Sequence, residues 1–210
     1  MTQRDIATTL LDRHGRTFAD EAGITLRDKP APLWQLLVLS LLASARISSD
    51  IATAAATELF KAGYRTPRKM CEATWQQRVD ALGRGHYRRY DERTSTMLGE
   101  CAEMLLDEHG GDLRKIHDGD TSDIEGALQA FKGVGPTGAA IFCREVQGVW
   151  PDLAPYIDKR TGDGAERLGL PRDAERLAKL VDASDLSRLV AGCVRAAGDK
   201  GLVEDVRDHA

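Results

Sequence analysis

The chain has 210 residues, and 42% of them are apolar, so it can form one large domain or two small ones around a real hydrophobic core. Charged residues make up 30% of the chain, yet the formal net charge is only −4. The net charge therefore cannot attract nucleic acid to the chain as a whole. Binding of nucleic acid would require the basic residues to gather on one face.

The cysteines give no sign of a metal site or a disulfide framework. They are widely spaced, share no metal-ligand spacing and lie among apolar neighbours: Cys71, Cys101, Cys143 and Cys193. We interpret them as reduced core cysteines of a cytoplasmic protein. The first residues do not form a signal-peptide pattern, and the longest apolar run, near 36–45, is too short to span a bilayer.

Apolar spacing predicts an all-α chain, because no segment shows a convincing strand alternation. The predicted helices cover about 6–21, 33–45, 51–61, a short piece from 67, 73–82, 92–108, two helices between 122 and 147, 171–181, and a last one from 184 followed by a polar tail. The helix over 33–45 is apolar nearly all round and should be buried.

Several expected boundaries rest on individual residues. Pro30 and Pro32 predict an extended connector before the buried helix. Ser49 or Asp50 is expected to cap the helix over 51–61. In the same way, Ser122 or Asp123 is expected to cap the first of the two helices between 122 and 147.

The segment 83–90 interleaves basic side chains with two tyrosines and reads Gly-Arg-Gly-His-Tyr-Arg-Arg-Tyr. A loop of this composition can contact phosphates and stack on bases. The alternative is a solvated loop that is stabilised by packing of its tyrosines. The candidate contacts are His86, Tyr87, Arg88 and Arg89.

Residues 128–142, Leu-Gln-Ala-Phe-Lys-Gly-Val-Gly-Pro-Thr-Gly-Ala-Ala-Ile-Phe, predict a helix-hairpin-helix. Gly133 and Gly135 leave no Cβ over the turn, so a phosphate can approach the amides, and the positive end of the second helix's dipole favours the anion. Val134 should fill the gap between the helices, and Pro136 suits the first turn of the second. Taken alone, Gly-Val-Gly with a proline could equally be a tight turn between helices.

In its context the hairpin resembles the helix-hairpin-helix DNA glycosylase superfamily, which includes endonuclease III. The matching hairpin residues are Leu128, Phe131, Gly133, Val134, Gly135 and Ala139. The apolar helix and the polar break at 46–50 also resemble that family, so the resemblance covers the chain from about Pro32 onward. It implies a two-domain helical architecture, with a central domain over 32–146 and a second domain formed by 1–31 and 147–210.

The resemblance implies the following site residues. Asp158, which follows the hairpin, matches the family's catalytic carboxylate; its other reading is an aspartate that caps the next helix. Such a carboxylate stabilises the positive charge that develops on the sugar when an N-glycosidic bond breaks. Arg46 aligns with a side chain that wedges into the gap left by an extruded base, or it is an ordinary surface arginine. Lys132, Thr137 and Lys159 join the hairpin as expected DNA contacts.

Two features of the family are missing. Bifunctional members carry a lysine two positions after the second hairpin glycine, where this chain has Thr137, and a hydroxyl cannot form an imine. Many relatives also hold an iron–sulfur cluster on four closely spaced C-terminal cysteines, whereas Cys193 is the only cysteine after Cys143. We therefore expect no metal and no cofactor.

The expected function is base-excision repair by a monofunctional DNA glycosylase that acts on double-stranded DNA with a damaged or mispaired base. We expect a monomer in the cytoplasm, associated with the nucleoid. Three alternatives stay open: a catalytically silent DNA-binding relative, a bifunctional glycosylase that uses a displaced lysine, and a helical interaction module without a DNA role.

Overall fold

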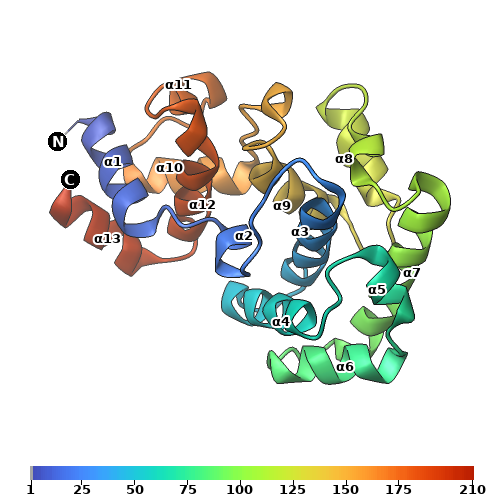
Figure 1. Cartoon of the computed structure of the whole chain (residues 1–210). Coiled ribbons are helices and arrows are strands. Elements are labelled where there is room, and N and C mark those ends of the chain that lie inside the picture. The colour runs from blue at the N-terminus through green and yellow to red at the C-terminus, as the bar shows by residue number, and fades with distance from the viewer. Residues whose placement is uncertain (1) are drawn as a thin grey trace. The chain divides into compact units, whose positions relative to one another are not determined.

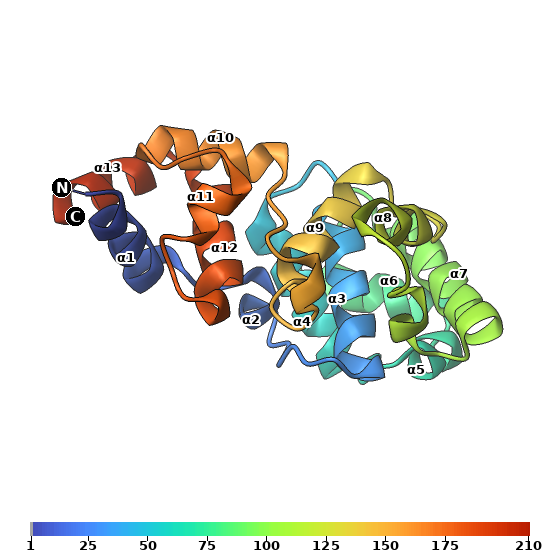
Figure 2. The same ribbon diagram turned by 90° about the horizontal axis from the view of Figure 1, so that it is seen from above.

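Residues 2–210 are described by a computed structural model, and they form α-helices and short 3-10 turns with no strand among them. By their contacts they divide into a terminal unit, made of 2–18 and 143–210, and a central unit, made of 19–142. Figures 1 and 2 label the elements of both units in two views. The sequence-based boundaries at 31/32 and 146/147 differ from these, because 19–31 contacts the central unit and the chain passes to the terminal unit inside a helix.

The central unit contains α3 (Pro30–Ala43), α4 (Ser49–Lys61), α5 (Pro67–Glu72), α6 (Trp75–Arg84), α7 (Asp91–His109), the 3-10 turn η1 (Leu113–Ile116) and α8 (Thr121–Gln129). Two helices lie across the unit boundaries, α2 (Phe18–Glu21) and α9 (Pro136–Val146). The terminal unit contains α1 (Gln3–His14), η2 (Pro151–Leu153), α10 (Lys159–Leu168), α11 (Ala174–Ala178), η3 (Ala183–Asp185), α12 (Leu186–Ala196) and α13 (Lys200–His209).

The apolar helix α3 is buried as predicted, since every residue from Leu33 to Leu42 is buried. Its start differs from the prediction. Pro30 is the first residue of the helix and Pro32 lies in its first turn, so the expected extended connector is wrong at these positions. The amides of a first turn have no acceptor within the helix, and proline therefore costs nothing there.

Two predicted helix caps are also wrong by one to three residues. Ser48, not Ser49 or Asp50, caps α4, because its side chain accepts a hydrogen bond from the Ile51 amide. Asp120 caps α8 by accepting from the Ser122 and Asp123 amides, at 2.8 and 3.1 Å. Each candidate could cap by residue type, and only the position of the first helical turn decides between neighbours.

Arg78 fastens α6 to its neighbours from inside the central unit. Its guanidinium donates to the carbonyls of Met70 and Ala73 near the end of α5, at 3.0 and 2.8 Å, and to that of Ser95 in α7, at 3.0 Å. Burial lowers the pKa of Arg78, and these carbonyl contacts offset the loss of water around the charge. These hydrogen bonds hold α6 in place, and α6 leads directly into the loop 85–90.

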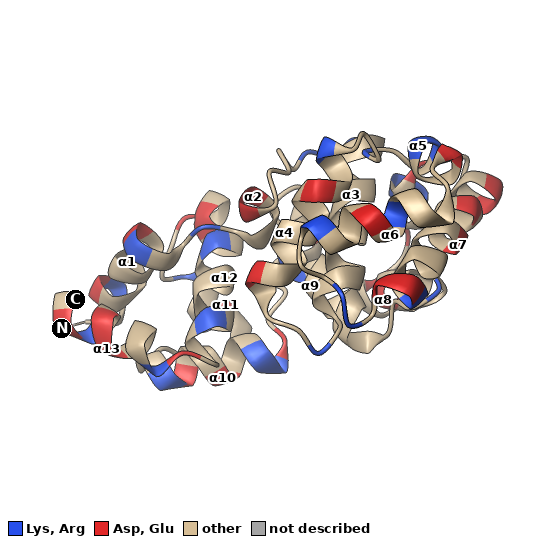
Figure 3. Cartoon of the chain, turned by 90° about the horizontal axis from the view of Figure 1, so that it is seen from below, with Lys and Arg blue, Asp and Glu red and all other residues tan. Residues whose placement is uncertain are grey.

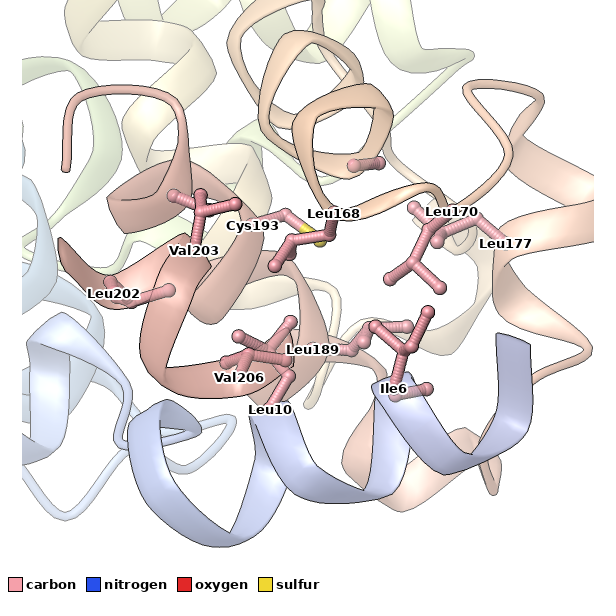
Figure 4. Close-up of a cluster of buried hydrophobic side chains, with 13 residues drawn as sticks. Ile6, Leu10, Leu168, Leu170, Leu177, Leu189, Cys193, Leu202, Val203 and Val206 are labelled. Atoms are coloured by element: carbon pink, nitrogen blue, oxygen red, sulfur yellow. The ribbon is translucent and has the colours of Figure 1, made fainter. Parts of the chain in front are cut away.

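The core of the terminal unit joins the two ends of the chain. Figure 4 shows side chains of α1, α10, α12 and α13 meeting in one apolar cluster. Its members include Ile6, Leu10, Leu168, Leu189, Cys193 and Val206. The expected polar tail after α12 is wrong, since residues 200–209 form α13 and bury Leu202, Val203 and Val206.

At the surface of this unit, Asp205 of α13 binds side chains of α1. Its carboxylate accepts from Arg13 Nε at 2.7 Å and lies 2.8 Å from His14 Nε2. These contacts hold the pKa of Asp205 well below its usual range, the Arg13 hydrogen bond being the largest cause. They attach the C-terminal helix to the N-terminal one.

This pairing predicts a pH-dependent difference for Asp205→Asn. A carboxyl with a pKa lowered by folding stabilises the protein above its unfolded value, near 3.8, and loses that contribution as the pH falls through the folded value. We expect the variant to unfold at lower urea than the wild type at pH 7, and the gap to close as the pH falls below 4. An equal gap at pH 7 and pH 3 would contradict the assignment.

Among residues 2–210, no helix combines the length and the apolar character that crossing a bilayer requires. In neither unit do lysines and arginines outnumber aspartates and glutamates. Figure 3 shows blue and red residues mixed along the helices of both units. Any anion site must therefore come from local placement of amides and side chains.

Candidate nucleic-acid interface and active site

The predicted hairpin is present between α8 and α9. Phe131 and Val134 are buried, with 1% and 3% of their surface exposed. Val134 lies against Gly138 of α9, where a Cβ on the glycine would come within 3.2 Å of Val134 Cγ1. Val134 therefore fills the space between the two helices, and only its backbone is available to a ligand.

The two hairpin glycines serve different purposes. Gly133 has φ +84°, a left-handed conformation that side chains disfavour, and a Cβ there would overlap Met97 of α7. Gly135 lacks a positive φ, and nothing lies within 4 Å of a Cβ built on it. The fold thus requires glycine at 133, whereas at 135 the missing side chain leaves open space over the turn.

The start of α9 leaves backbone amides without a hydrogen-bond acceptor among residues 2–210. Gly135 accepts from the Ala139 amide at 3.0 Å, which closes the first turn. In the described part of the chain, no hydrogen-bond acceptor is found for the amides of Gly135, Thr137 and Gly138. Unpaired amides at a helix start, together with the helix dipole, form a site that suits a phosphate.

The glycines predict two contrasting alanine variants. Gly133→Ala should destabilise the protein by about 1–3 kcal/mol, because it combines left-handed strain with overlap at Met97. Gly135→Ala should change stability by less than about 1 kcal/mol and weaken duplex DNA binding, since its methyl group projects over the amides. Urea unfolding and fluorescence anisotropy measure the two effects. Unchanged DNA affinity in Gly135→Ala would count against phosphate contact at the hairpin.

Most of the other predicted DNA contacts are exposed. Arg46 lies in the loop between α3 and α4, and Lys132 and Thr137 flank the hairpin. Lys132 is also held through its backbone, because its carbonyl accepts from Cys101 Sγ at 3.1 Å. Lys132 and Thr137 both belong to the hairpin, while Arg46 lies on a separate loop of the central unit.

The loop 85–90 is partly as predicted. His86 has φ +63° and is exposed. Arg88 and Arg89 are also exposed, and the guanidinium of Arg89 lies 5.3 Å from the centre of the Tyr90 ring. Tyr87 contradicts the prediction. It is 2% exposed and its hydroxyl lies 3.4 Å from Thr94 Oγ1, so it packs in the core and cannot stack on a base. The alternation of basic and aromatic residues did not show which ring faces inward.

Asp158 is the N-cap of α10, so the structure bears out the capping role considered for it. Oδ1 accepts from the Thr161 amide at 3.0 Å and from the Thr161 hydroxyl at 2.7 Å. The second oxygen, Oδ2, takes no part in the cap and lies 3.7 Å from Arg144 Nε. The carboxylate is thus fixed at one oxygen, and 19% of the side chain is exposed.

Neighbouring charges complete this part of the terminal unit. Lys159, a predicted DNA contact, is 85% exposed and pairs with Asp163 at 2.6 Å on the surface of α10. Arg144, at the end of α9, is 8% exposed. Burial lowers the pKa of Arg144, and the charge of Asp158 is the largest opposing influence.

Three residues around Asp158 were not predicted from the sequence. Gln147 follows the last turn of α9 and hydrogen-bonds the backbone of Tyr156, while Arg144 faces the carboxylate and Thr161 binds it. The pattern Asp-x-x-Thr is a readable sign of the cap. Nothing in the sequence shows that Arg144 and Gln147 face the segment before Asp158.

No metal site is seen in the described residues, since no group of three or more histidine, cysteine, aspartate or glutamate side chains is placed to hold an ion. Cys193 is buried, which raises the pKa of its thiol to about 12, and no other cysteine follows Cys143.

Comparisons with known proteins give one kind of match. No family model and no curated protein matches the sequence. Among solved structures, the chain is similar to a trapped covalent endonuclease III–DNA intermediate in an estranged-adenine complex, with 19% identity and a TM-score of 0.50. A non-covalent endonuclease III–DNA complex gives 17% identity and a TM-score of 0.51. Each alignment covers 92% of this chain and 85% of the other.

The chain has an endonuclease III-like fold. This confirms the predicted fold class, all-α with a helix-hairpin-helix, over nearly the whole chain. At this level of identity the endonuclease III-like fold says nothing about which residues act, so the site rests on the geometry above.

Proposed function

We propose that this chain binds double-stranded DNA with a damaged or mispaired base and hydrolyses the N-glycosidic bond of that base as a monofunctional DNA glycosylase. The observation that carries the proposal is the geometry of the Asp158 carboxylate. Its cap to α10 uses Oδ1 and fixes the carboxylate, while Oδ2 is outside the cap. A fixed carboxylate beside the sugar lowers the energy of the positively charged transition state and can orient water.

The hairpin supports the DNA-binding half of the proposal. It offers unpaired amides at the start of α9, an open surface over Gly135 and the exposed Lys132. These groups suit the phosphate backbone, which fixes position without reading sequence. The base itself must leave the stack before it can be excised.

Thr137 supports hydrolysis over lyase chemistry. It is exposed in the first turn of α9, and its hydroxyl cannot form a Schiff base with the sugar. We therefore propose that water is the nucleophile and that the abasic strand is left intact.

A nicking assay tests this function. Labelled duplexes with uracil, oxidised pyrimidines, alkylated purines, mismatches or an abasic site are incubated with the protein and read with and without alkali. Breaks that appear only after alkali support a monofunctional glycosylase and identify its base. A covalent adduct trapped by borohydride would show instead that a lysine elsewhere performs lyase chemistry.

The second candidate is a DNA-binding relative without catalysis, which the lack of a lysine at position 137, occupied by Thr137, favours. Salt-dependent binding without breaks on any substrate would support it. DNA binding that does not change with salt concentration, or no DNA binding, would contradict both candidates and favour a helical interaction module.

A further inference from the structure

The end of α9 holds the segment that carries Asp158. Gln147, 3% exposed, binds the backbone of Tyr156 twice: Oε1 accepts from the Tyr156 amide at 2.9 Å, and Nε2 donates to the Tyr156 carbonyl at 3.2 Å. Tyr156 lies two residues before Asp158, in a segment without regular secondary structure. The Gln147 side chain therefore fixes the backbone at Tyr156, where a loop would otherwise be mobile.

Arg144 lies in the last turn of α9, three residues before Gln147, which directly follows the helix. Gln147 Nε2 also donates to the Arg144 carbonyl at 2.9 Å, which ties both residues into one arrangement. The 3.7 Å between Arg144 Nε and Asp158 Oδ2 is too long for a hydrogen bond. The attraction is Coulombic, and it acts where little water screens it, because Arg144 is 8% exposed.

We propose that Arg144 is a positioning residue for Asp158. Its charge attracts Oδ2 away from the cap, while Gln147 fixes the backbone beneath the carboxylate. Because no hydrogen bond joins the two groups, the lone pairs of Oδ2 stay available to the sugar or to water. The catalytic meaning of this inference rests on the proposed glycosylase function, whereas the pairing itself does not.

The first test measures base release by the full chain under single-turnover conditions. Arg144→Met should lower the rate about 10- to 100-fold, a loss like that caused by removing a group that orients a metal ligand, with DNA affinity changed less than about threefold. Arg144→Lys, which keeps the charge, should recover most of the rate. A merely structural role would change affinity and helix content together with rate. Release by Arg144→Met within about twofold of wild type would overturn the inference.

The second test does not need activity. Urea unfolding is measured for the wild type, Asp158→Asn, Arg144→Met and the double variant. Asp158→Asn removes the negative charge that faces the buried guanidinium, so Arg144→Met should cost less stability in the Asp158→Asn background than in the wild type. Additive losses would overturn the pairing.

The two tests separate the inference from the function. Strong coupling in a wild-type protein that releases no base would support the positioning and contradict the proposed glycosylase. Base release by the wild type, without energetic coupling between Asp158 and Arg144, would support the glycosylase function and overturn the positioning role of Arg144.

Discussion

Asp158→Asn should abolish measurable base release, with a loss of at least about 100-fold in the single-turnover rate, and should leave DNA affinity within a few-fold of wild type. An amide cannot stabilise developing positive charge on the sugar as a carboxylate does. The cap survives, because asparagine is as good an N-cap as aspartate and its oxygen can still accept from Thr161. Lost activity would therefore report chemistry and not unfolding.

Asp173→Asn is the matched control. Asp173 also caps a helix of the terminal unit, α11, by accepting from the Arg176 amide at 2.9 Å, and it is exposed. We expect normal base release from it. If both variants lose activity alike, general weakening of helix caps explains the result; if neither does, Asp158 is not the catalytic carboxylate.

Gly164→Ala should cause the largest loss of stability, about 3 kcal/mol or more, with failure to fold as the extreme result. In the terminal unit α10 and α12 approach so closely at Gly164 that a Cβ would overlap the Cys193 carbonyl oxygen, which is backbone and cannot rotate away. The helices must separate, and the packing of Ala165, Leu168 and Leu189 loosens with them. Urea unfolding followed by circular dichroism measures the loss.

Gly126→Ala gives the comparison for that experiment. Gly126 lies inside α8, its φ is not positive, and nothing lies within 4 Å of an added Cβ. Alanine should be neutral there or stabilise by up to about 1 kcal/mol, because it has the higher helix propensity. Equal effects at 126 and 164 would show that helix propensity, and not the close approach of α10 and α12, governs the result.

The candidate site was predictable where local pattern decides structure. The Gly-Val-Gly turn between two apolar helical faces is a local signal, and it placed the hairpin correctly. Tyr87 shows the opposite case, since an aromatic ring between basic residues is equally compatible with stacking on a base and with burial. The core of the central unit decided for burial, at 2% exposure.

The sequence by itself determined the helical class, the buried helix α3 and the hairpin, because each depends on spacing within one segment. It also determined that Thr137 cannot act as an amine nucleophile, which is a matter of residue type alone. The tertiary structure decided the rest. Residues 200–209 form a helix, α13, because Leu202, Val203 and Val206 pack against apolar side chains of α1, α10 and α12. The tertiary structure also brought Arg144 and Gln147 to the segment of Asp158, since contacts between elements depend on how helices pack and no spacing along the chain encodes them.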